Sequence, residues 1–406
     1  MKLILLSGGS GKRLWPLSND QQSKQFLKLL RKSNGLESMV QRVWSQLEEL
    51  DLTKDTLIAT GESQRNILKN QLNIMDDKII TEPNRRDTFP AIALASAYLY
   101  SELGVSEDEV IIVLPVDPYV DKDFFNKLND LKNLVLQEET KLGLIGINPT
   151  LPSEKYGYII PHENIMNEVS HFIEKPNEHL AKKLIEKGAV WNAGVFAFQL
   201  STIKDNLEKR NFSFEYSRMI EDYDELPRKS FDYEFTEKQN SIKFLKYNGF
   251  WKDLGTWNTL SEEMDTHKVG DLIETIDCLN THVINDTRKP ISVIGVKDLI
   301  VAAGSEGILV STKKDSPRIK ELPEHIFKSI NYYENDWGKT SILFESNNSK
   351  IILFEIFDSK SFKLVLSEDN KLVRFSGVGN IEEINQDAVI HGIDNFKVIL
   401  IHKTNQ

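Results

Sequence analysis

A glycine-rich segment near the start of the chain could hold a polyphosphate. Residues 7–13 read Ser-Gly-Gly-Ser-Gly-Lys-Arg and follow an apolar run, Lys2 to Leu6. Backbone amides can approach phosphate oxygens closely at glycine, because no Cβ is in the way. Arg13 stands where a P-loop requires Ser or Thr, and Leu14 stands where a dinucleotide-binding loop requires a small residue. The segment therefore matches neither motif, and its glycines alone are equally typical of a tight turn.

Asp117 could hold a hard cation. It follows a strongly apolar run, Val110 to Val116, which indicates a buried strand. A carboxylate at the carboxyl end of a central parallel strand is a suitable ligand for Mg²⁺. The alternative is an acidic residue in an ordinary turn. No cluster of His or Cys in the sequence indicates a zinc site.

Alternating strands and helices up to about residue 260 would position these groups. The strands are separated by about 10 to 15 helical residues, which is typical of βαβ crossovers and a mostly parallel sheet. A helix is predicted from Leu36 to Leu50, and Pro90 indicates the first turn of another. The predicted strands are Lys2 to Leu6, Thr56 to Thr60, Lys78 to Thr81, Glu109 to Leu114, Leu142 to Ile147, His171 to Ile173 and Val195 to Phe198. We expect a Rossmann-like α/β fold, whose ligands bind beyond the carboxyl ends of the strands.

After about residue 270 the helical pattern stops and short β-branched runs follow one another, which predicts a smaller C-terminal all-β region. We place the domain boundaries at 1–265 for the α/β domain, 266–322 for a β-rich extension and 323–406 for a small β domain. Small β units of this kind pack against the main domain or against a second subunit, so a homo-oligomer is a further expectation.

The composition restricts the partners of the chain. The 406 residues carry 50 basic and 61 acidic side chains, a net charge of −11, so a nucleic-acid partner is not expected. A lone cysteine, Cys278, excludes an internal disulfide framework and agrees with a reducing compartment. No apolar run approaches the ~18 residues of a membrane span, and the apolar start is too short for a signal peptide. We therefore expect a cytoplasmic protein without a membrane partner.

Seven segments together resemble the signature of the sugar-phosphate nucleotidylyltransferases. They occur in that family's order: Gly8 to Leu27, Glu82 to Ala93, Leu114 to Asp117, Tyr156 to Ile159, Phe172 to Pro176, Trp191 to Phe196 and Trp251 to Trp257. The Trp-Pro-Leu-Ser form at residues 15–18 is similar to the mannose-1-phosphate guanylyltransferase branch. The resemblance covers residues 1 to about 310, so chance is a poor explanation.

The resemblance assigns roles that residue types alone leave open. Nucleotidyl transfer brings two anions together at the α-phosphorus, so the site must supply cations and fixed donors. A lone Lys or Arg is otherwise most often a solvated surface cation. By family position Arg13 and Lys24 are catalytic, and Mg²⁺ is the implied cofactor. The other implied sites are nucleotide binding by Gly8, Gly9, Ser10, Gly11, Lys12, Arg86 and Asp87, sugar-phosphate binding by Gly157, Glu174, Lys175 and Asn192, and metal binding by Asp117 and Asp253.

Departures from the family pattern leave the specificity open. The family usually has Asn, Ala and His at three positions where this chain has Asp87, Phe89 and Pro118, and Pro where it has Ser23. The Ser-Lys-Gln form at residues 23–25 is also found in glucose-1-phosphate thymidylyltransferases. Another nucleotide or another hexose 1-phosphate therefore stays open.

The last part of the chain resembles a cupin-type phosphomannose isomerase module at Asp336 to Lys339. Such a module binds its metal through several His and Glu ligands from neighbouring strands. Residues 323–406 contain only His325, His391 and His402, and no His-x-His pair. We therefore expect a degenerate cupin-like β module without isomerase chemistry, which serves assembly or regulation.

The predicted function is transfer of a guanylyl group from GTP to mannose 1-phosphate, which gives GDP-mannose for polysaccharide biosynthesis and releases pyrophosphate. The alternative from another class is a non-catalytic homologue that binds a nucleotide sugar. Retention of both Asp117 and Asp253 favours catalysis, because a binding-only protein has no need of two metal carboxylates.

Overall fold

The computed structural model describes residues 1–9, 11–32, 35–137, 140–327, 332–346, 349–366, 370–384 and 387–403. Contacts between residues divide the chain into two compact units. The first unit contains Met1–Gly8, Met39–Arg65 and Ile74–Leu254, and the second contains Gly9–Ser38, Asn66–Asn73 and Gly255–Gln406. None of the helices in the described ranges is both long and apolar enough to span a bilayer.

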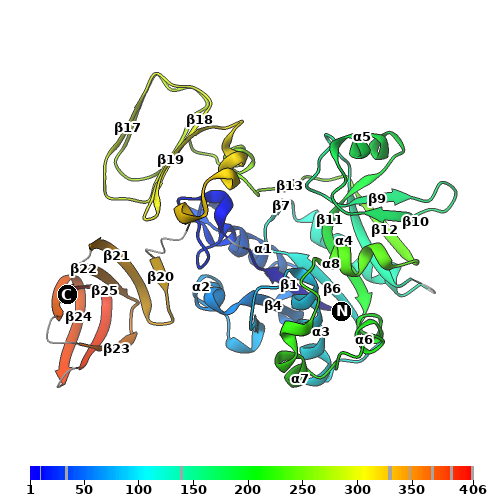
Figure 1. The fold of residues 1–406 in the computed structure, drawn as a ribbon, viewed down its shortest axis with the longest axis horizontal. Helices are drawn as coiled ribbons and strands as arrows, with labels where there is room; N and C mark the ends of the chain where they lie inside the picture. The colour runs from blue at the N-terminus through cyan, green and yellow to red at the C-terminus, as the bar shows by residue number, and fades with distance from the viewer. Residues whose placement is uncertain are drawn as a thin grey trace. The chain divides into compact units, whose positions relative to one another are not determined.

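A nine-stranded mixed sheet forms the centre of the first unit (Figure 1). From one edge its strands are β10 (Val169–Ile173), β9 (Tyr158–Pro161), β11 (Val190–Gln199), β6 (Val110–Pro115), β1 (Lys2–Ser7), β4 (Thr56–Gly61) and β5 (Ile79–Glu82), while β8 (Leu142–Ile147) pairs with β11 and β12 (Ile242–Tyr247). The run β6-β1-β4-β5 is parallel throughout, and β12 is parallel to β8. Strand β11 is antiparallel to its neighbours. The predicted α/β class with a mostly parallel sheet and a C-terminal all-β region is confirmed.

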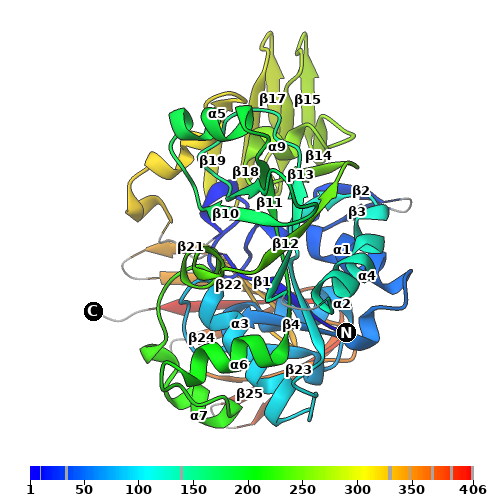
Figure 2. The ribbon, with the colours of Figure 1, turned by 90° about the vertical axis from the view of Figure 1, so that its right-hand side faces the viewer.

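Helices cover both faces of this sheet, because its strands are apolar on both sides. The helices of the first unit are α1 (Met39–Glu48), α3 (Thr88–Ser101), α4 (Asp123–Val135), α5 (Glu178–Glu186), α6 (Leu200–Glu208), α7 (Tyr216–Glu221) and α8 (Phe231–Glu234). Helix α2 (Glu62–Leu72) begins in the first unit and continues into the second. Ile4 and Val113 pack in one core with α3, α6 and α8. Side chains alternate along a strand, so Leu3 and Ile112 face the other side, where α4 contacts β6, β8, β11 and β12 (Figure 2).

The second unit begins with the glycine-rich loop and continues into a series of short, mostly parallel strands, which we call the coils. A short hairpin, β2 (Leu30–Lys32) and β3 (Gly35–Glu37), precedes α1, and α9 (Trp257–Ser261) opens the C-terminal part. The coils are built from β14 (Lys268–Gly270), β15 (Ile273–Ile276), β16 (His282–Asn285), β17 (Ile291–Ile294), β18 (Leu299–Gly304) and β19 (Gly307–Thr312). Strands β14, β16 and β18 are parallel in one sheet, β15 and β17 are parallel in another, and β19 is antiparallel to β18. The all-β prediction for this region is confirmed.

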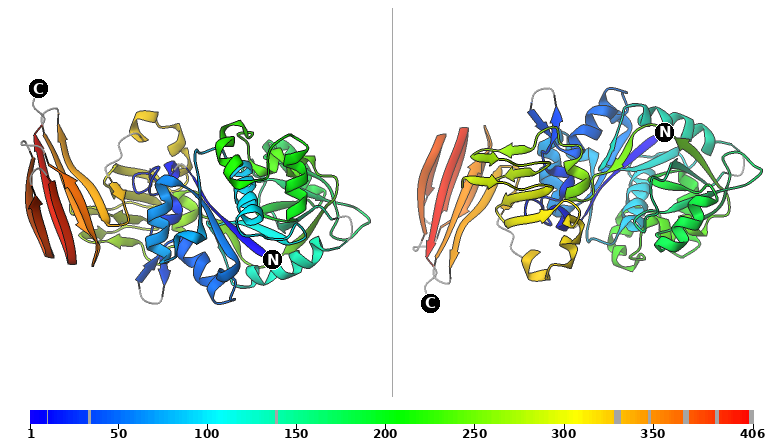
Figure 3. Two further views of the ribbon diagram at one scale, coloured as in Figure 1. Left: turned by 90° about the horizontal axis from the view of Figure 1, so that it is seen from below. Right: turned by 90° about the horizontal axis from the view of Figure 1, so that it is seen from above.

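The chain then forms two short 3₁₀ turns, Ser316–Glu321 and Glu324–Phe327, and a six-stranded antiparallel sheet (Figure 3). The sheet contains β20 (Tyr332–Glu334), β21 (Gly338–Ser346), β22 (Ser349–Ile356), β23 (Ser361–Val365), β24 (Asn370–Ile384) and β25 (Asp387–Lys403). Trp337 stacks on Phe362 with ring centroids 3.8 Å apart. His391 Nδ1 lies 2.9 Å from Ser361 Oγ, and His402 lies against Asn370, so the two histidines have separate polar neighbours.

Candidate functional site

The four residues predicted to bind the sugar phosphate lie together in the first unit. Glu174 and Lys175 follow β10, Asn192 lies in β11, and Gly157 precedes β9. Glu174 and Asn192 are 7% and 6% exposed. The Asn192 N–H donates to the Gly157 carbonyl at 2.8 Å, and Lys175 Nζ donates to Glu174 Oε1 at 2.5 Å. These residues form one polar cluster, in which Glu174 and Asn192 are buried and Lys175 is exposed, and we call it the β10/β11 cluster.

The backbone of this cluster is constrained at Gly157 and at Lys175. A Cβ at Gly157 would lie 2.4 Å from Phe172 Cζ and 2.6 Å from Glu174 Oε2, so a side chain there would displace the glutamate. Lys175 has a φ of 45°, a left-handed conformation that costs about 1–2 kcal/mol for a residue with a Cβ. Its N–H donates to the Tyr156 carbonyl at 3.2 Å. Local hydrogen bonding therefore holds Lys175 in a conformation that the free chain would avoid.

Asp232 joins the β10/β11 cluster, although no sequence pattern singled it out. Its Oδ1 accepts a hydrogen bond from Asn192 Nδ2 at 2.9 Å. It lies in the first turn of α8, where the Ser230 hydroxyl accepts the Tyr233 N–H at 3.3 Å as an N-cap. An acidic residue after a Ser cap is typical of any helix start, so no local pattern indicated a site here.

Three ionisable groups of the cluster shift one another's pKa. Burial raises the pKa of Asp232 to about 7, and the charge of Glu174 adds to this rise. Burial also raises the pKa of Glu174, against the hydrogen bond from Lys175. Burial alone would lower the pKa of Lys175, but Glu174 and Asp232 outweigh it, and that pKa is raised. The ammonium therefore stays charged, while the two carboxyl groups titrate as a pair and retain a proton well above the usual carboxyl range.

Asp232→Asn is expected to raise the melting temperature at pH 8 and to leave it near wild type at pH 4. At a pH between 3.8, the ordinary pKa of an aspartate, and about 7, the pKa of Asp232 in the folded protein, the folded wild type keeps a proton on Asp232 that the unfolded chain has released. The wild type therefore loses stability as the pH rises through this window, and an amide does not. Thermal unfolding of both proteins from pH 4 to 8 measures the difference.

Glu234→Gln, on the same helix, is the control with the opposite sign. Glu234 is 4% exposed and accepts from Arg210 at 2.9 Å and Lys238 at 2.8 Å. Burial opposes these cations, but together they lower its pKa. This variant should therefore be less stable than wild type at pH 8. A melting temperature of Asp232→Asn that tracks wild type at every pH would contradict the raised pKa of Asp232.

The two predicted metal carboxylates, far apart in the sequence, lie on neighbouring segments of the first unit. Strand β7 (Pro118–Val120) pairs antiparallel with β13 (Trp251–Asp253), and this register sets Asp253 opposite Pro118, the residue after Asp117. The turn before β13 is held by Asp121, which accepts the Tyr247 hydroxyl and the Phe250 N–H.

These two carboxylates fit a hard cation in the chemistry of their oxygen donors. Within the described ranges of the chain, no group of three or more His, Cys, Asp and Glu side chains could enclose a metal ion. Mg²⁺ commonly takes one or two protein carboxylates and completes its shell with water and substrate phosphates. Asp117 and Asp253 match that mode of binding and not a closed protein cage.

In the second unit, the glycine-rich loop is held in shape by its own side chains. Gly11 has a φ of 63°, and its carbonyl accepts the Ser18 hydroxyl, which in turn accepts the Leu14 N–H at 3.2 Å. Asn19 Oδ1 accepts the N–H groups of Gln21 and Gln22 at 2.9 and 2.8 Å. These bonds stabilise the loop before any ligand binds.

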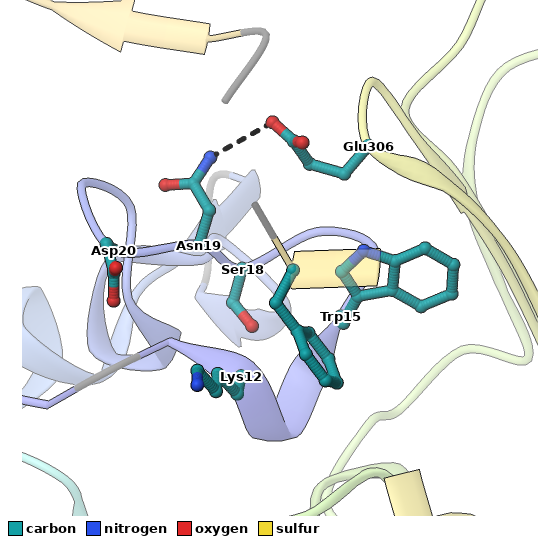
Figure 4. Close-up of a pocket in the computed structure, with 7 residues that line it drawn as sticks. Lys12, Trp15, Ser18, Asn19, Asp20 and Glu306 are labelled. Atoms are coloured by element: carbon teal, nitrogen blue, oxygen red, sulfur yellow. Dashed lines mark hydrogen bonds between the residues drawn. The ribbon is translucent and has the colours of Figure 1, made fainter. Parts of the chain in front are cut away.

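Residues from the C-terminal part of the second unit line the same loop. Figure 4 shows Lys12, Trp15, Ser18, Asn19, Asp20 and Glu306 around a pocket that Phe327 also lines. Asn19 Nδ2 donates to Glu306 at 3.3 Å, and Lys12 Nζ contacts Glu324 at 2.8 Å. The Trp257 indole donates to the Trp15 carbonyl at 3.0 Å. The β region therefore supports the loop directly, which the sequence did not indicate.

The predicted catalytic residues and the other predicted residues of the glycine-rich loop differ in exposure. Arg13 is exposed in the turn Lys12–Leu14, and Lys24 is half-buried in the turn Lys24–Phe26. Gly8 and Gly9 are exposed, and Ser10 lies outside the described residues.

Arg86 and Asp87 serve the local fold of the first unit. The Arg86 guanidinium donates to the Leu226 carbonyl at 2.8 Å and contacts Asp224 at 3.4 Å. Asp87 has a φ of 72° and caps α3 by accepting the Thr88 N–H at 2.8 Å. Any contact of these two side chains with a nucleotide would come in addition to these bonds.

Comparisons with known proteins agree with this architecture. Residues 2–268 match the model of the family described as nucleotidyl transferase. A mannose-1-phosphate guanylyltransferase of Escherichia coli is 30% identical in a comparison that covers 80% of this chain and 75% of that protein. A relative from Vibrio cholerae serotype O1 is 28% identical in a comparison that covers 96% of this chain and 91% of that protein.

A solved structure is similar over most of the chain. The crystal structure of a Thermus thermophilus protein described as a mannose-1-phosphate geranyltransferase has a TM-score of 0.67 and 29% identity. The likeness covers 80% of this chain and 98% of the Thermus chain. Since the family model matches well over half of the sequence, the chain belongs to the nucleotidyl transferase family.

Proposed function

We propose that the protein transfers a guanylyl group from GTP to mannose 1-phosphate and releases pyrophosphate. The observation that carries this proposal is the β10/β11 cluster, which combines a buried carboxylate, a buried amide and a fixed ammonium group in a family of nucleotidyl transferases. Carboxylate and amide suit sugar hydroxyls, and the ammonium suits the phosphate. The name of the Escherichia coli relative supports mannose 1-phosphate and a guanylyl group.

The glycine-rich loop is the proposed site of the triphosphate. Glycines Gly8, Gly9 and Gly11, together with Ser10, let backbone amides approach the phosphates, and Lys12 supplies a nearby cation. Arg13 and Lys24 would stabilise the charge that develops on the α-phosphate and on the leaving pyrophosphate. Arg86 and Asp87 are proposed to contact the nucleotide from the start of α3.

Asp117 and Asp253 are proposed to hold Mg²⁺. When bound, the ion would neutralise phosphate charge and orient the two reacting groups. The two aspartates would hold the ion near the carboxyl end of β6, which is where ligands of such sheets bind. A reducing compartment suits the lone Cys278, so we propose the cytoplasm as the location and polysaccharide biosynthesis as the use of the product.

The direct test is pyrophosphate release by the purified full chain with Mg²⁺. GTP, dTTP, UTP and ATP are each offered with mannose 1-phosphate, glucose 1-phosphate or galactose 1-phosphate. The highest kcat/KM is expected for GTP with mannose 1-phosphate. A preference for dTTP with glucose 1-phosphate would replace the proposed substrates, and no release with any pair would favour a protein that only binds nucleotide sugars.

A deletion series is expected to separate the two β regions. A chain that ends at residue 331 keeps Glu306, Glu324 and Phe327, so it should retain most of the kcat. A chain that ends at residue 265 loses these contacts to the loop and should lose most of the kcat. Circular dichroism and gel filtration show whether each protein is folded. Equal activity of two folded truncations would show that the coils do not support the loop.

A further inference from the structure

Asp232 belongs to the β10/β11 cluster but has no role in the function proposed above. Asn192 donates a hydrogen bond to Asp232, and the amide of Asn192 is the group proposed to form hydrogen bonds with hydroxyl groups of the sugar. We propose that Asp232 is a positioning residue for the sugar site, which holds the Asn192 amide in one orientation with an N–H left over for a sugar hydroxyl. This inference rests on the proposed sugar-phosphate function.

The two ends of the Asn192 amide have different partners. Asn192 Oδ1 accepts the Gly194 N–H at 3.2 Å, and Nδ2 donates to Asp232 Oδ1 at 2.9 Å. The Gly194 N–H can only donate, and the Asp232 carboxyl can only accept once it is ionised, so above its pKa of about 7 a flipped amide would oppose like groups at both ends. Its orientation is therefore set by chemistry at both contacts. With Asp232 removed, only the weaker contact with Gly194 would oppose a flip.

One hydrogen of the amide remains for a ligand. Nδ2 carries two hydrogens, and one of them points to Asp232. Among the described residues, Asn192 Nδ2 has no second acceptor. Asn192 lies beside Gly157, whose missing Cβ lets Phe172 and Glu174 pack against its backbone. A sugar hydroxyl could accept the second N–H there while Glu174 accepts a hydrogen bond from a hydroxyl.

The position of Asp232 is fixed by the core beneath it. Phe231 is fully buried, with ring centroids 4.7 Å from Phe235 and 4.9 Å from Phe196. Its N–H donates to Thr88 Oγ1 at 2.8 Å. These contacts hold the first turn of α8 in place, so the Asp232 backbone cannot move away when a ligand enters. A carboxylate with a fixed backbone is a suitable anchor for a neighbouring amide.

The experiment compares steady-state kinetics of the full chain and five variants. Asp232→Ala should raise the KM for mannose 1-phosphate about 10- to 100-fold, the usual scale of a lost hydrogen bond to a charged group. The KM for GTP should change less than about twofold, because the proposed nucleotide site does not include Asn192. In Asp232→Asn the KM for mannose 1-phosphate should stay within about fivefold of the wild-type value, since the new amide oxygen can still accept the hydrogen bond from Asn192 Nδ2. The double variant Asp232→Ala with Asn192→Ala should match Asn192→Ala alone, because Asp232 acts through Asn192.

Glu234→Gln is the matched control, because Glu234 lies on the same helix and its carboxylate forms salt bridges with Arg210, Lys229 and Lys238, which lie outside the cluster. It should lower the melting temperature without changing the KM for mannose 1-phosphate. The inference is overturned if Asp232→Ala raises the KM for GTP as much as the KM for mannose 1-phosphate. It is also overturned if Glu234→Gln raises the KM for mannose 1-phosphate as much as Asp232→Ala does. A double variant whose KM for mannose 1-phosphate shows the effects of Asp232→Ala and Asn192→Ala added together would overturn it too.

Calorimetric binding of mannose 1-phosphate gives a readout that does not depend on turnover. If the wild type releases no pyrophosphate, the proposed function fails, and the inference is then judged by binding alone. Weaker binding by Asp232→Ala, with recovery in Asp232→Asn, supports it. Equal binding by wild type and Asp232→Ala, or no binding by either, overturns it.

Discussion

Asp117→Asn is expected to lower kcat roughly 10²- to 10³-fold while the melting temperature stays close to wild type. The amide has nearly the same shape as the carboxylate, so the segment between β6 and β7 keeps its backbone. A neutral amide is a poor ligand for Mg²⁺, which prefers charged oxygen donors. Asp253→Asn should behave in the same way, because β13 sets it opposite the residue after Asp117. The measurements are kcat and the Mg²⁺ concentration that gives half-maximal activity.

Asp121→Asn is the control for this prediction, because Asp121 lies in the same segment of the chain. Its carboxylate accepts the Phe250 N–H at 3.1 Å and the Tyr247 hydroxyl, so its role is to hold a turn. The variant should lower the melting temperature and leave the Mg²⁺ requirement unchanged. If Asp117→Asn keeps wild-type kcat and wild-type Mg²⁺ dependence, the metal assignment is wrong.

The core strands could be predicted from sequence because they are buried on both faces and are nearly continuous apolar runs. The run Leu142 to Ile147 is β8 with the predicted bounds, and the run Lys2 to Leu6 is one residue short of β1. Strand β12 was missed, since two lysines interrupt the apolar residues of Ile-Lys-Phe-Leu-Lys-Tyr at the edge of the sheet, and the run shows neither a continuous apolar stretch nor strict alternation. The antiparallel direction of β11 could not be predicted from its residue types, because the connections between strands, more than the residues of a strand, determine whether neighbours run parallel or antiparallel.

The site was only partly visible in the sequence, for a similar reason. Motif position brought Glu174, Lys175 and Asn192 into one expected set, and the structure places them together. Asp232 was missed, because an acid after a Ser cap is common at helix starts and its importance comes from a contact with β11. Long-range contacts of this kind have no local pattern, and the support of the loop by Glu306 and Phe327 is another example.

Gly11→Ala is expected to lower kcat by about 100-fold or more and to reduce the stability of the loop by about 1–3 kcal/mol. Gly11 has a φ of 63°, and a Cβ at this position would lie 1.8 Å from the Asn19 carbonyl oxygen. That oxygen belongs to backbone held by the Asn19 side chain, so the loop must open to relieve the clash. Opening would break the bond from Ser18 to the Gly11 carbonyl and move Lys12 and Arg13 out of position.

Gly8→Ala separates this structural need from the need for close approach to a phosphate. A Cβ at position 8 would meet no atom within 4 Å, so the variant should keep the melting temperature of wild type. The same Cβ would stand where a phosphate oxygen is proposed to approach the backbone, so the KM for GTP should rise while the KM for mannose 1-phosphate stays unchanged. Stability and the two KM values, measured for both variants, distinguish the roles. Wild-type kinetics in Gly8→Ala would move the triphosphate away from this glycine, and wild-type stability and kcat in Gly11→Ala would show that the loop does not need its left-handed residue.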